Sequence, residues 1–122
     1  MIKNIVILSF IIVLIDSLYL KLLSKHFGNL VAKIQKGDKM KFRFLPAIVC
    51  YIFLVFSLYY FIILKNGTDL DAAILGWVIY GVFETTNGAI FKDWDILSMV
   101  IDTTWGGILY YLTTKVYRSI DM

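Results

Sequence analysis

The chain has 122 residues, of which 60% are hydrophobic and only 17% charged, and its mean hydropathy is +0.79. Soluble domains have about 25% charged and about 45–50% apolar residues, so this composition excludes an ordinary soluble domain. The net charge of +3 comes from basic residues that lie mostly between apolar segments, and no helix-turn-helix, zinc or RNA-binding motif accompanies them. We therefore expect contact with lipid headgroups and no nucleic-acid partner.

Four apolar runs follow one another, each close to the roughly 20 residues that a bilayer-spanning helix needs. They predict membrane helices at about residues 4–23, 44–64, 70–91 and 96–114. The first begins like a secretory signal, but no small-residue cleavage site follows it and Asp16 lies inside it, which favours a retained helix. The predicted fold class is an all-α integral membrane protein: one domain over residues 1–122, folded as a four-transmembrane-helix bundle.

The connector between the first two helices, about residues 24–43, is long and basic. Apolar residues stand at i, i+3, i+4 and i+7, namely Phe27, Leu30, Val31 and Ile34. This spacing predicts a short basic helix on the membrane surface. A solvated basic loop is an equal alternative, because the glycines of this segment weaken a helix. Either form presents cations to anionic lipid headgroups, at Lys33, Lys36, Lys39, Lys41 and Arg43.

The other two connectors are short. The residues from Asn66 to Asp69 (Asn-Gly-Thr-Asp) predict a tight turn. The residues from Lys92 to Asp95 predict a second turn, in which Trp94 suits the interfacial aromatic belt and Asp95 caps the fourth helix.

The distribution of basic residues predicts the orientation. Eight lie on the side of the first and third connectors: Lys21, Lys25, Lys33, Lys36, Lys39, Lys41, Arg43 and Lys92. Four lie on the opposite side: Lys3, Lys65, Lys115 and Arg118. This excess places the first and third connectors in the cytoplasm and both termini outside, in a plasma or inner membrane.

Three acidic residues lie inside the apolar runs: Asp16, Glu84 and Asp102. Each is about six or seven residues from the same end of the bundle, which at about 1.5 Å per residue is a depth of roughly 10 Å. Ionisable groups at such depth cost roughly 2.5–3.5 kcal/mol on insertion scales and typically mark functional sites. The sequence thus predicts one layer of carboxyl groups contributed by three helices.

Neighbouring residues complete a candidate pocket. Tyr19 follows Asp16 by three residues and Trp105 follows Asp102 by three, so each aromatic ring shares a helix face with an acid. The predicted pocket consists of Asp16, Tyr19, Tyr80, Glu84, Asn87, Asp102 and Trp105. Glycines in the third and fourth helices, Gly81, Gly88, Gly106 and Gly107, allow close helix packing. The second helix has no charge and is interpreted as scaffold or lipid-facing wall.

No basic residue lies at the depth of the three acids. They must therefore hold protons, share them, or bind a cation. The preferred function is an acidic pocket that binds or conducts a proton, a cation or a cationic small molecule. If the cation is a metal, its ligands are Asp16, Glu84 and Asp102; no cofactor is expected. The alternative is a structural membrane protein, or an assembly partner in a complex or an enveloped particle, whose protonated acids join the helices.

An enzyme acting on lipid ranks below both readings, because the sequence has no nucleophile beside a base and no metal-binding histidines. Four short helices also suggest a homo-oligomer as the unit that encloses a path.

Several of these residues form motifs that resemble a family of small, mainly bacterial membrane proteins of unknown function. The segment from Tyr80 to Asn87 (Tyr-Gly-Val-Phe-Glu-Thr-Thr-Asn), followed by Lys92-Asp93-Trp94, resembles that family's third-helix motif. Asp16-Ser-Leu-Tyr19 and Asp102-Thr-Thr-Trp105-Gly resemble its first-helix and fourth-helix motifs. Tyr19 replaces the family's tryptophan, and Glu84 replaces its aspartate with a longer side chain. The resemblance implies a four-span fold and these signature positions, and it implies no known activity.

Overall fold

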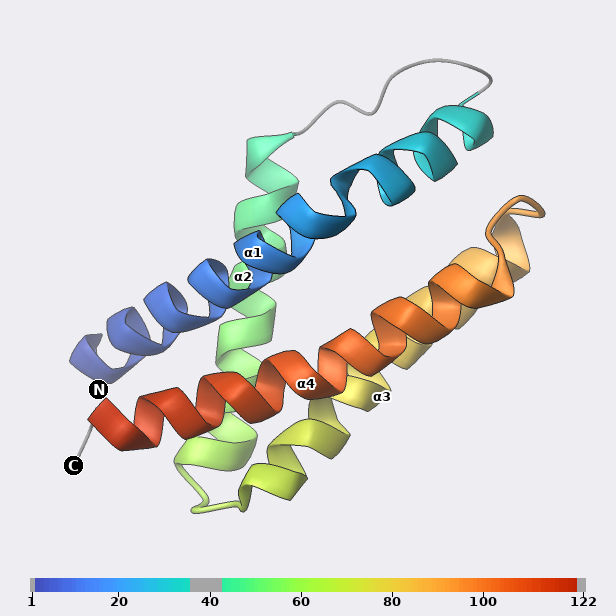
Figure 1. Ribbon diagram of the computed structural model, residues 1–122. Helices are drawn as coiled ribbons and strands as arrows, with labels where there is room; N and C mark the ends of the chain where they lie inside the picture. Colours follow the sequence, from blue (N-terminus) through green and yellow to red (C-terminus); the bar gives the residue numbers. More distant parts are fainter. Residues whose placement is uncertain (1, 36–42, 121–122) are drawn as a thin grey trace.

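The computed structural model describes residues 2–35 and 43–120, and every regular element in this part of the chain is helical. The helices are α1 (Ile2–Ile34), α2 (Phe44–Leu58), α3 (Asp69–Ile90) and α4 (Ile96–Ile120). Figure 1 shows the beginning of α1 and the end of α4 at one end of the molecule, with the turn between α3 and α4 at the other. The prediction of an all-α chain with four principal helices is confirmed, and the four-span arrangement stays a proposal.

Helix α1 is longer than the apolar run that predicted it. It continues for 33 residues to Ile34, so the segment with the amphipathic spacing is the last part of this helix, and neither a separate surface helix nor a loop forms there. At about 1.5 Å per residue it measures about 50 Å, well beyond the roughly 30 Å of a bilayer core. The part after Ser24 reaches the turn between α3 and α4, where Lys33 Nζ lies 4.0 Å from Asp93 Oδ1.

The predicted basic headgroup contacts fall partly on this end of α1. The side chain of Lys33 is 67% exposed and Arg43 is also exposed, as a headgroup contact requires. Lys36, Lys39 and Lys41 lie outside the described residues.

Helix α2 begins at Phe44, as predicted, with Pro46 in its first turn, and ends in a π-helical turn, Tyr59–Ile63. The chain then reverses in a tight turn, where Asn66 adopts a left-handed conformation with φ of 54° and Gly67 N donates to Ile62 O at 2.8 Å. Thr68 begins α3 with a reciprocal capping box to Asp71. The end of α4 holds this turn in place, since Arg118 donates to Asp69 Oδ1 at 3.0 Å and also to the carbonyl oxygen of Gly67.

Helices α3 and α4 pack against each other along glycine residues. A Cβ atom on Gly76 would overlap the carbonyl oxygen of Gly106 and lie 2.7 Å from Tyr110 Cγ. The prediction for Gly106 is confirmed, but its partner is Gly76. Gly81 has ordinary room, with Thr103 Cγ2 3.5 Å from a Cβ placed there. The backbones therefore approach most closely at Gly76 and Gly106.

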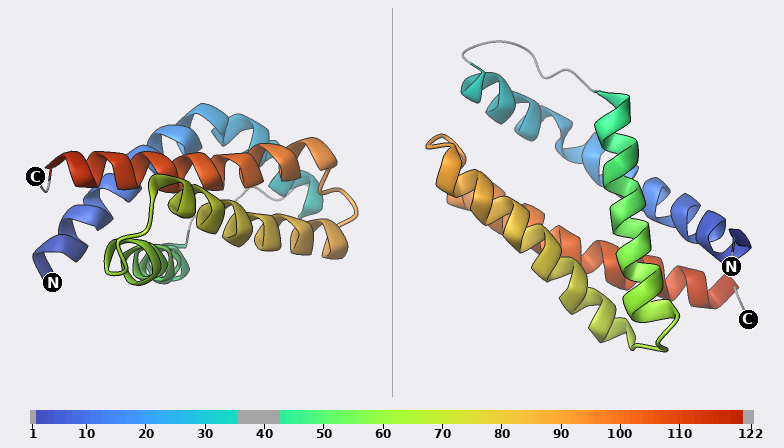
Figure 2. Two further views of the ribbon diagram at one scale, coloured as in Figure 1. Left: turned by 90° about the horizontal axis from the view of Figure 1, so that it is seen from below. Right: turned by 180° about the vertical axis from the view of Figure 1, so that it is seen from behind.

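Helix α2 crosses the other three at a steep angle and packs on α1 near its middle (Figure 2). The buried core joins apolar residues of all four helices: Leu8, Ile11, Ile12, Leu54, Val55, Leu58, Tyr59, Ile62, Ala72, Leu109, Tyr110 and Tyr117. Tyr110 is fully buried, and its hydroxyl donates to the carbonyl oxygen of Leu54 at 2.9 Å. The same hydroxyl lies 2.7 Å from Ser57 Oγ. This polar contact attaches α2 to α4 within an otherwise apolar core.

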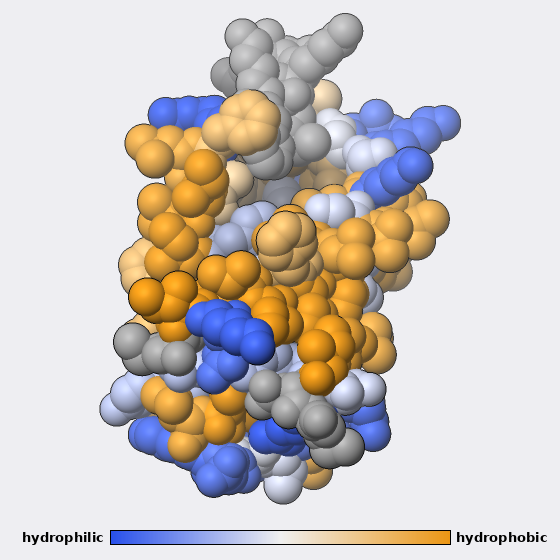
Figure 3. All heavy atoms as spheres, turned by 90° about the vertical axis from the view of Figure 1, so that its left-hand side faces the viewer, coloured by the Kyte–Doolittle hydropathy of each residue, from blue (hydrophilic) through white to orange (hydrophobic). Residues whose placement is uncertain are grey.

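The exterior of the molecule is largely apolar. Two of the described helices, Ile2–Ile34 and Phe44–Ile63, are long and apolar enough to cross a membrane. Figure 3 shows apolar side chains over most of the middle of one face, with polar ones gathered toward its upper and lower ends. Large exposed hydrophobic residues also line α3 and α4, including Ile74 and Trp77 on α3 and Val100 and Ile108 on α4. A surface of this kind suits lipid better than water.

Asp95 caps α4 as the sequence predicts, because Ser98 N donates to Asp95 Oδ1 at 2.7 Å. Hydrogen bonding from Ser98, first from its side chain and then from its backbone, lowers the pKa of Asp95 below its ordinary value. Because the pKa of Asp95 is lower in the folded state, the ionised carboxylate contributes its full stabilisation at pH values above the unfolded-state pKa of about 4. This stabilisation is lost as the pH falls through the lower pKa of the folded state.

We therefore expect Asp95→Ala to lower the free energy of unfolding by about 1 kcal/mol at neutral pH. Asp95→Asn keeps a capping oxygen and removes the charge. The difference in unfolding free energy between the wild type and Asp95→Asn, measured in detergent at pH 6 and again at pH 3, should shrink at the lower pH. A difference that grows on acidification would contradict this account.

Candidate functional site

The acids and aromatic residues of α1 and α4 form two crossed pairs. Tyr19 of α1 donates its hydroxyl to Asp102 Oδ1 of α4 at 2.9 Å, and Trp105 of α4 donates its indole N–H to Asp16 Oδ1 of α1 at 2.8 Å. The sequence grouped each ring with the acid of its own helix. The structure pairs each ring with the acid of the other helix. Because α1 and α4 run in opposite directions, Tyr19 lies level with Asp102, and Asp16, three residues earlier on α1, lies level with Trp105, three residues later on α4.

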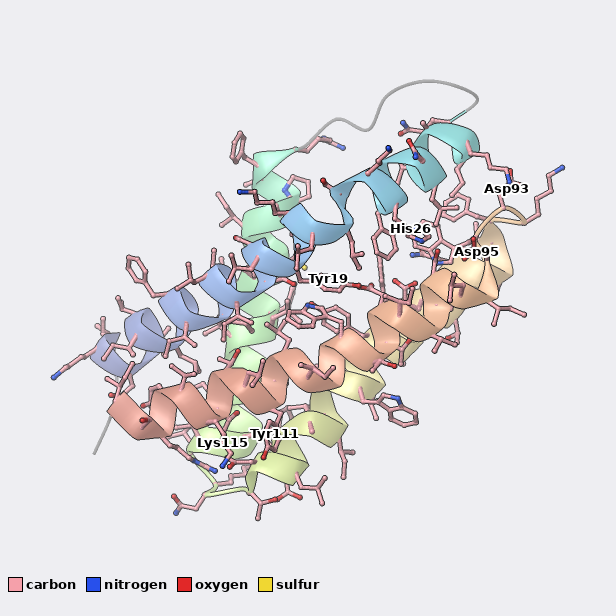
Figure 4. The ribbon with its side chains drawn as sticks, viewed as in Figure 1. Tyr19, His26, Asp93, Asp95, Tyr111 and Lys115 are labelled. Atoms are coloured by element: carbon pink, nitrogen blue, oxygen red, sulfur yellow. The ribbon has the colours of Figure 1, made fainter. Side chains whose placement is uncertain are left out.

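The two rings of these pairs also stack. The ring centroids of Tyr19 and Trp105 are 4.4 Å apart and the planes differ by 2°. Figure 4 shows Tyr19 in the space between α1 and α4. Each ring thus covers one face of the other, so no ligand fits between them, and the two together form a single wall.

Asp16 is satisfied on both of its oxygens. Tyr51 of α2 donates to Oδ2 at 2.5 Å, in addition to the Trp105 contact with Oδ1, and only 6% of Asp16 is exposed. One carboxyl group thereby joins α1, α2 and α4. The sequence assigned helix two no part in the site, because it has no charge; an uncharged tyrosine at this depth was the signal that could have revealed its contribution.

Glu84 of α3 is the most buried of the three acids, with no exposed surface. Trp94 donates its indole N–H to Oε1 at 2.8 Å. Oε2 is buried and has no hydrogen-bond donor among the described residues. The half-buried carboxyl group of Asp102 lies near the carboxyl group of Glu84. One carboxyl oxygen in the site is therefore left open, beside a second carboxyl group.

The end of the site that faces the turn between α3 and α4 is covered by aromatic residues. Trp94 reaches Glu84 from this turn, and the ring of Phe27 lies 6.2 Å from the ring of Trp94, centroid to centroid. His26 Nε2 lies 2.8 Å from Oγ of the fully buried Ser98. Figure 4 shows His26 and Asp95 together at this end, beyond Tyr19. The sequence placed Trp94 in an aromatic belt; the structure brings both Trp94 and His26 to this end of the site.

The remaining predicted residues are less central. Tyr80 packs against Gly106 on α4 and lines a pocket of about 310 Å³ that reaches Asp102. Asn87 is half-buried on α3, and within the described residues no hydrogen bond involves its side chain. No cluster of three His, Cys, Asp or Glu side chains in the described part of the chain has the geometry to hold a metal ion. Asp16, Glu84 and Asp102 thus lie in one region without converging on a common point.

A known family matches this chain over residues 1–117, and its description reads "Predicted membrane protein (DUF2177)". The chain belongs to the DUF2177 family. The resemblance inferred from the three acidic motifs is confirmed by this match, which covers all four helices. Neither the curated proteins nor the solved structures include a match.

Membership of DUF2177 makes this chain a membrane protein in contact with the lipid bilayer, and the family has no assigned function. The apolar exterior of the helices agrees with that environment. What the site does has to be argued from its geometry.

Proposed function

We propose that this DUF2177 protein spans the membrane with all four helices and that its Glu84–Asp102 carboxyl pair binds, or passes, a proton or a cation. The observation that carries the proposal is the open Oε2 atom of Glu84, which is buried, lacks a donor and lies beside Asp102. Two neighbouring carboxylates inside a low-dielectric bundle cannot both remain ionised without compensation.

The compensation does not come from a basic residue. Within the described residues, the ion pairs of lysine and arginine involve only Asp69 and Asp93, both outside the pair. A proton shared by the two carboxyl groups or a cation beside them would supply the missing positive charge. The pair is therefore a site for a positive charge.

The four-span arrangement is supported by length and by surface. Helices α3 and α4 have 22 and 25 residues, enough at about 1.5 Å per residue to cross a core of about 30 Å. The start of α1, the end of α4 and the turn at Gly67 lie toward one end of the molecule (Figure 1), which supports placing both termini on one side of the membrane. The excess of basic residues at the other end supports placing the first and third connectors in the cytoplasm and both termini outside. A second copy of the chain would help to enclose a path across the bilayer.

The structural alternative is favoured at one position. Asp16 has both oxygens engaged and joins three helices, as a structural carboxyl group would. A scaffold or assembly partner built entirely on such contacts would have no open oxygen, so variants of Glu84 and Asp102 are the ones that distinguish the two functions.

The test is the thermal stability of the purified protein in detergent, measured across pH and with a panel of cations. A cation at about 100 times its Kd stabilises the folded state by about 2.7 kcal/mol, which is readily detected. We expect a gain for one class of cation, or a dependence on pH, that Glu84→Gln and Asp102→Asn both abolish. Asp93→Asn, which removes a half-buried carboxylate on the turn between α3 and α4, outside the pair, is the matched control and should keep the gain.

A binding result would justify a flux measurement in proteoliposomes. If Glu84→Gln and Asp102→Asn leave stability unchanged or raise it, and neither pH nor any cation matters, the pair is structural and the proposed function is wrong.

A further inference from the structure

The pocket that reaches Asp102 lies between α2 and α3, and it is distinct from the covered end of the site. Its volume is about 310 Å³, at the lower end of the range for small-molecule sites, about 300–1,000 Å³. Uncharged residues line it except for one acid: Cys50, Phe53 and Leu54 of α2, Ile79, Tyr80 and Phe83 of α3, and Asp102 of α4. The pocket therefore joins an apolar wall to a single negative group.

The rim of this pocket lies on the apolar exterior. Phe53 is 70% exposed and Phe83 is 57% exposed, one on each side of the pocket. In a membrane these two rings face acyl chains and not water. The opposite approach, from the turn between α3 and α4, is covered by Trp94 bound to Glu84 and by Phe27 beside Trp94.

From this arrangement we infer that the ligand of the carboxyl pair is an amphiphilic amine, a monocation with a hydrocarbon chain that reaches Asp102 sideways from the bilayer. This inference rests on the proposed function and names its ligand. The ammonium group pairs with Asp102 and supplies the positive charge that the neighbouring Oε2 of Glu84 lacks. The hydrocarbon chain occupies the apolar wall between α2 and α3 and extends between Phe53 and Phe83.

The features of the pocket distinguish this ligand from a simple inorganic cation. A hydrated metal ion gains nothing from an apolar rim and would have to leave its water before reaching Asp102. An alkylammonium ion keeps its chain in apolar surroundings along the whole path, first among the acyl chains and then at the wall between α2 and α3, and brings only its head group to the acid. The pocket between α2 and α3 therefore offers a negative group to the ammonium head at one end and an apolar wall to the hydrocarbon chain along the rest of its length.

Cys50 provides the readout, because it is the only cysteine of the chain and it lines the pocket. The experiment measures the rate at which N-ethylmaleimide modifies Cys50 in the purified protein in an uncharged detergent, followed by intact mass. The probes are decylamine, decanol as the uncharged chain, and ethylamine as the charge without a chain. At ten times its Kd, decylamine should slow labelling about tenfold, since about nine-tenths of the sites are then occupied.

Two variants locate the effect. Asp102→Asn keeps an acceptor for Tyr19 and removes the charge, and it should abolish protection by decylamine. Ile79→Trp fills the pocket without changing any charge, so it should also abolish protection while the stabilisation by cations, measured as above, persists. In Asp93→Asn, decylamine should protect Cys50 from labelling to the same extent as in the wild type. Protection that survives in Ile79→Trp would place the ligand elsewhere and overturn the inference.

The other outcomes separate this inference from the proposed function. Equal protection by decanol would show an adventitious additive only and would overturn recognition of the amine. Equal protection by ethylamine, or stabilisation by inorganic cations without any protection by decylamine, would overturn the route from the bilayer and leave the proposed function standing. If no cation protects Cys50 and none stabilises the protein, both are overturned.

Discussion

Gly76→Ala is expected to lower the free energy of unfolding by about 1–3 kcal/mol, although alanine favours a helix by about 1 kcal/mol over glycine. The reason is the close approach of α3 and α4, where the added Cβ would overlap the carbonyl oxygen of Gly106. A backbone atom cannot rotate away as a side chain can, so the two helices have to separate. Reversible unfolding in mixed micelles measures the loss.

Gly81→Ala is the matched control for this substitution. It lies on the same helix, and its Cβ would meet only Thr103 Cγ2, at an ordinary 3.5 Å. We expect it to leave the free energy of unfolding unchanged or to raise it by up to about 1 kcal/mol through helix propensity. Equal effects of Gly76→Ala and Gly81→Ala would show that the packing of α3 on α4 described above does not exist in the membrane.

Asp16→Ala is expected to lower the free energy of unfolding by about 2 kcal/mol. The substitution leaves the hydroxyl of Tyr51 and the indole N–H of Trp105 without an acceptor. A donor left unpaired costs about 1–3 kcal/mol in soluble proteins, whereas an interhelical hydrogen bond in a membrane is worth about 0.6 kcal/mol on average. For two donors the expected loss of about 2 kcal/mol lies between the sums of these two estimates.

A double-mutant cycle tests whether the Asp16 contact is responsible. Asp16→Ala and Tyr51→Phe should be coupled by about 0.5–1.5 kcal/mol, because each removes one partner of the same hydrogen bond. Tyr60→Phe, in the π-helical turn that ends α2, is the control: in the described residues no hydrogen bond involves its hydroxyl, so no coupling to Asp16→Ala is expected. If Asp16→Ala stabilises the protein, its burial outweighs its hydrogen bonds and the structural role is wrong.

Asp16 is expected to stabilise the fold, whereas the Glu84–Asp102 pair is expected to bind a positive charge, and this difference has a physical basis. A carboxyl group with both oxygens bonded to donors on two other helices stabilises the fold. Glu84 has one oxygen bonded to Trp94 and one without a donor, so part of its capacity to interact is unused. The three acids that look equivalent in the sequence thus differ in how far their oxygens are hydrogen-bonded.

The sequence by itself determined where the four helices lie and most of their ends, except that α1 and α4 continue beyond the predicted residues 23 and 114. Long apolar runs can satisfy their backbone only as helices in lipid, and Asp95 before α4 and the Asn66-Gly67 turn before α3 are local signals, which is why these predictions agree with the structure. The sequence also selected the three acids, because an acid inside an apolar run is visible without knowledge of packing. The length of α1 was underestimated, since an amphipathic continuation and a separate surface helix have the same spacing.

Only the tertiary structure decided which groups meet. A spacing of three residues places Tyr19 beside Asp16 on one helix face, but the antiparallel crossing of α1 and α4 brings Tyr19 to Asp102 and Trp105 to Asp16. The roles of Tyr51 and Trp94 and the contact between Gly76 and Gly106 likewise depend on how each helix is rotated about its axis. That rotation is set by contacts between residues far apart in the chain, and no pattern within a single helix specifies it.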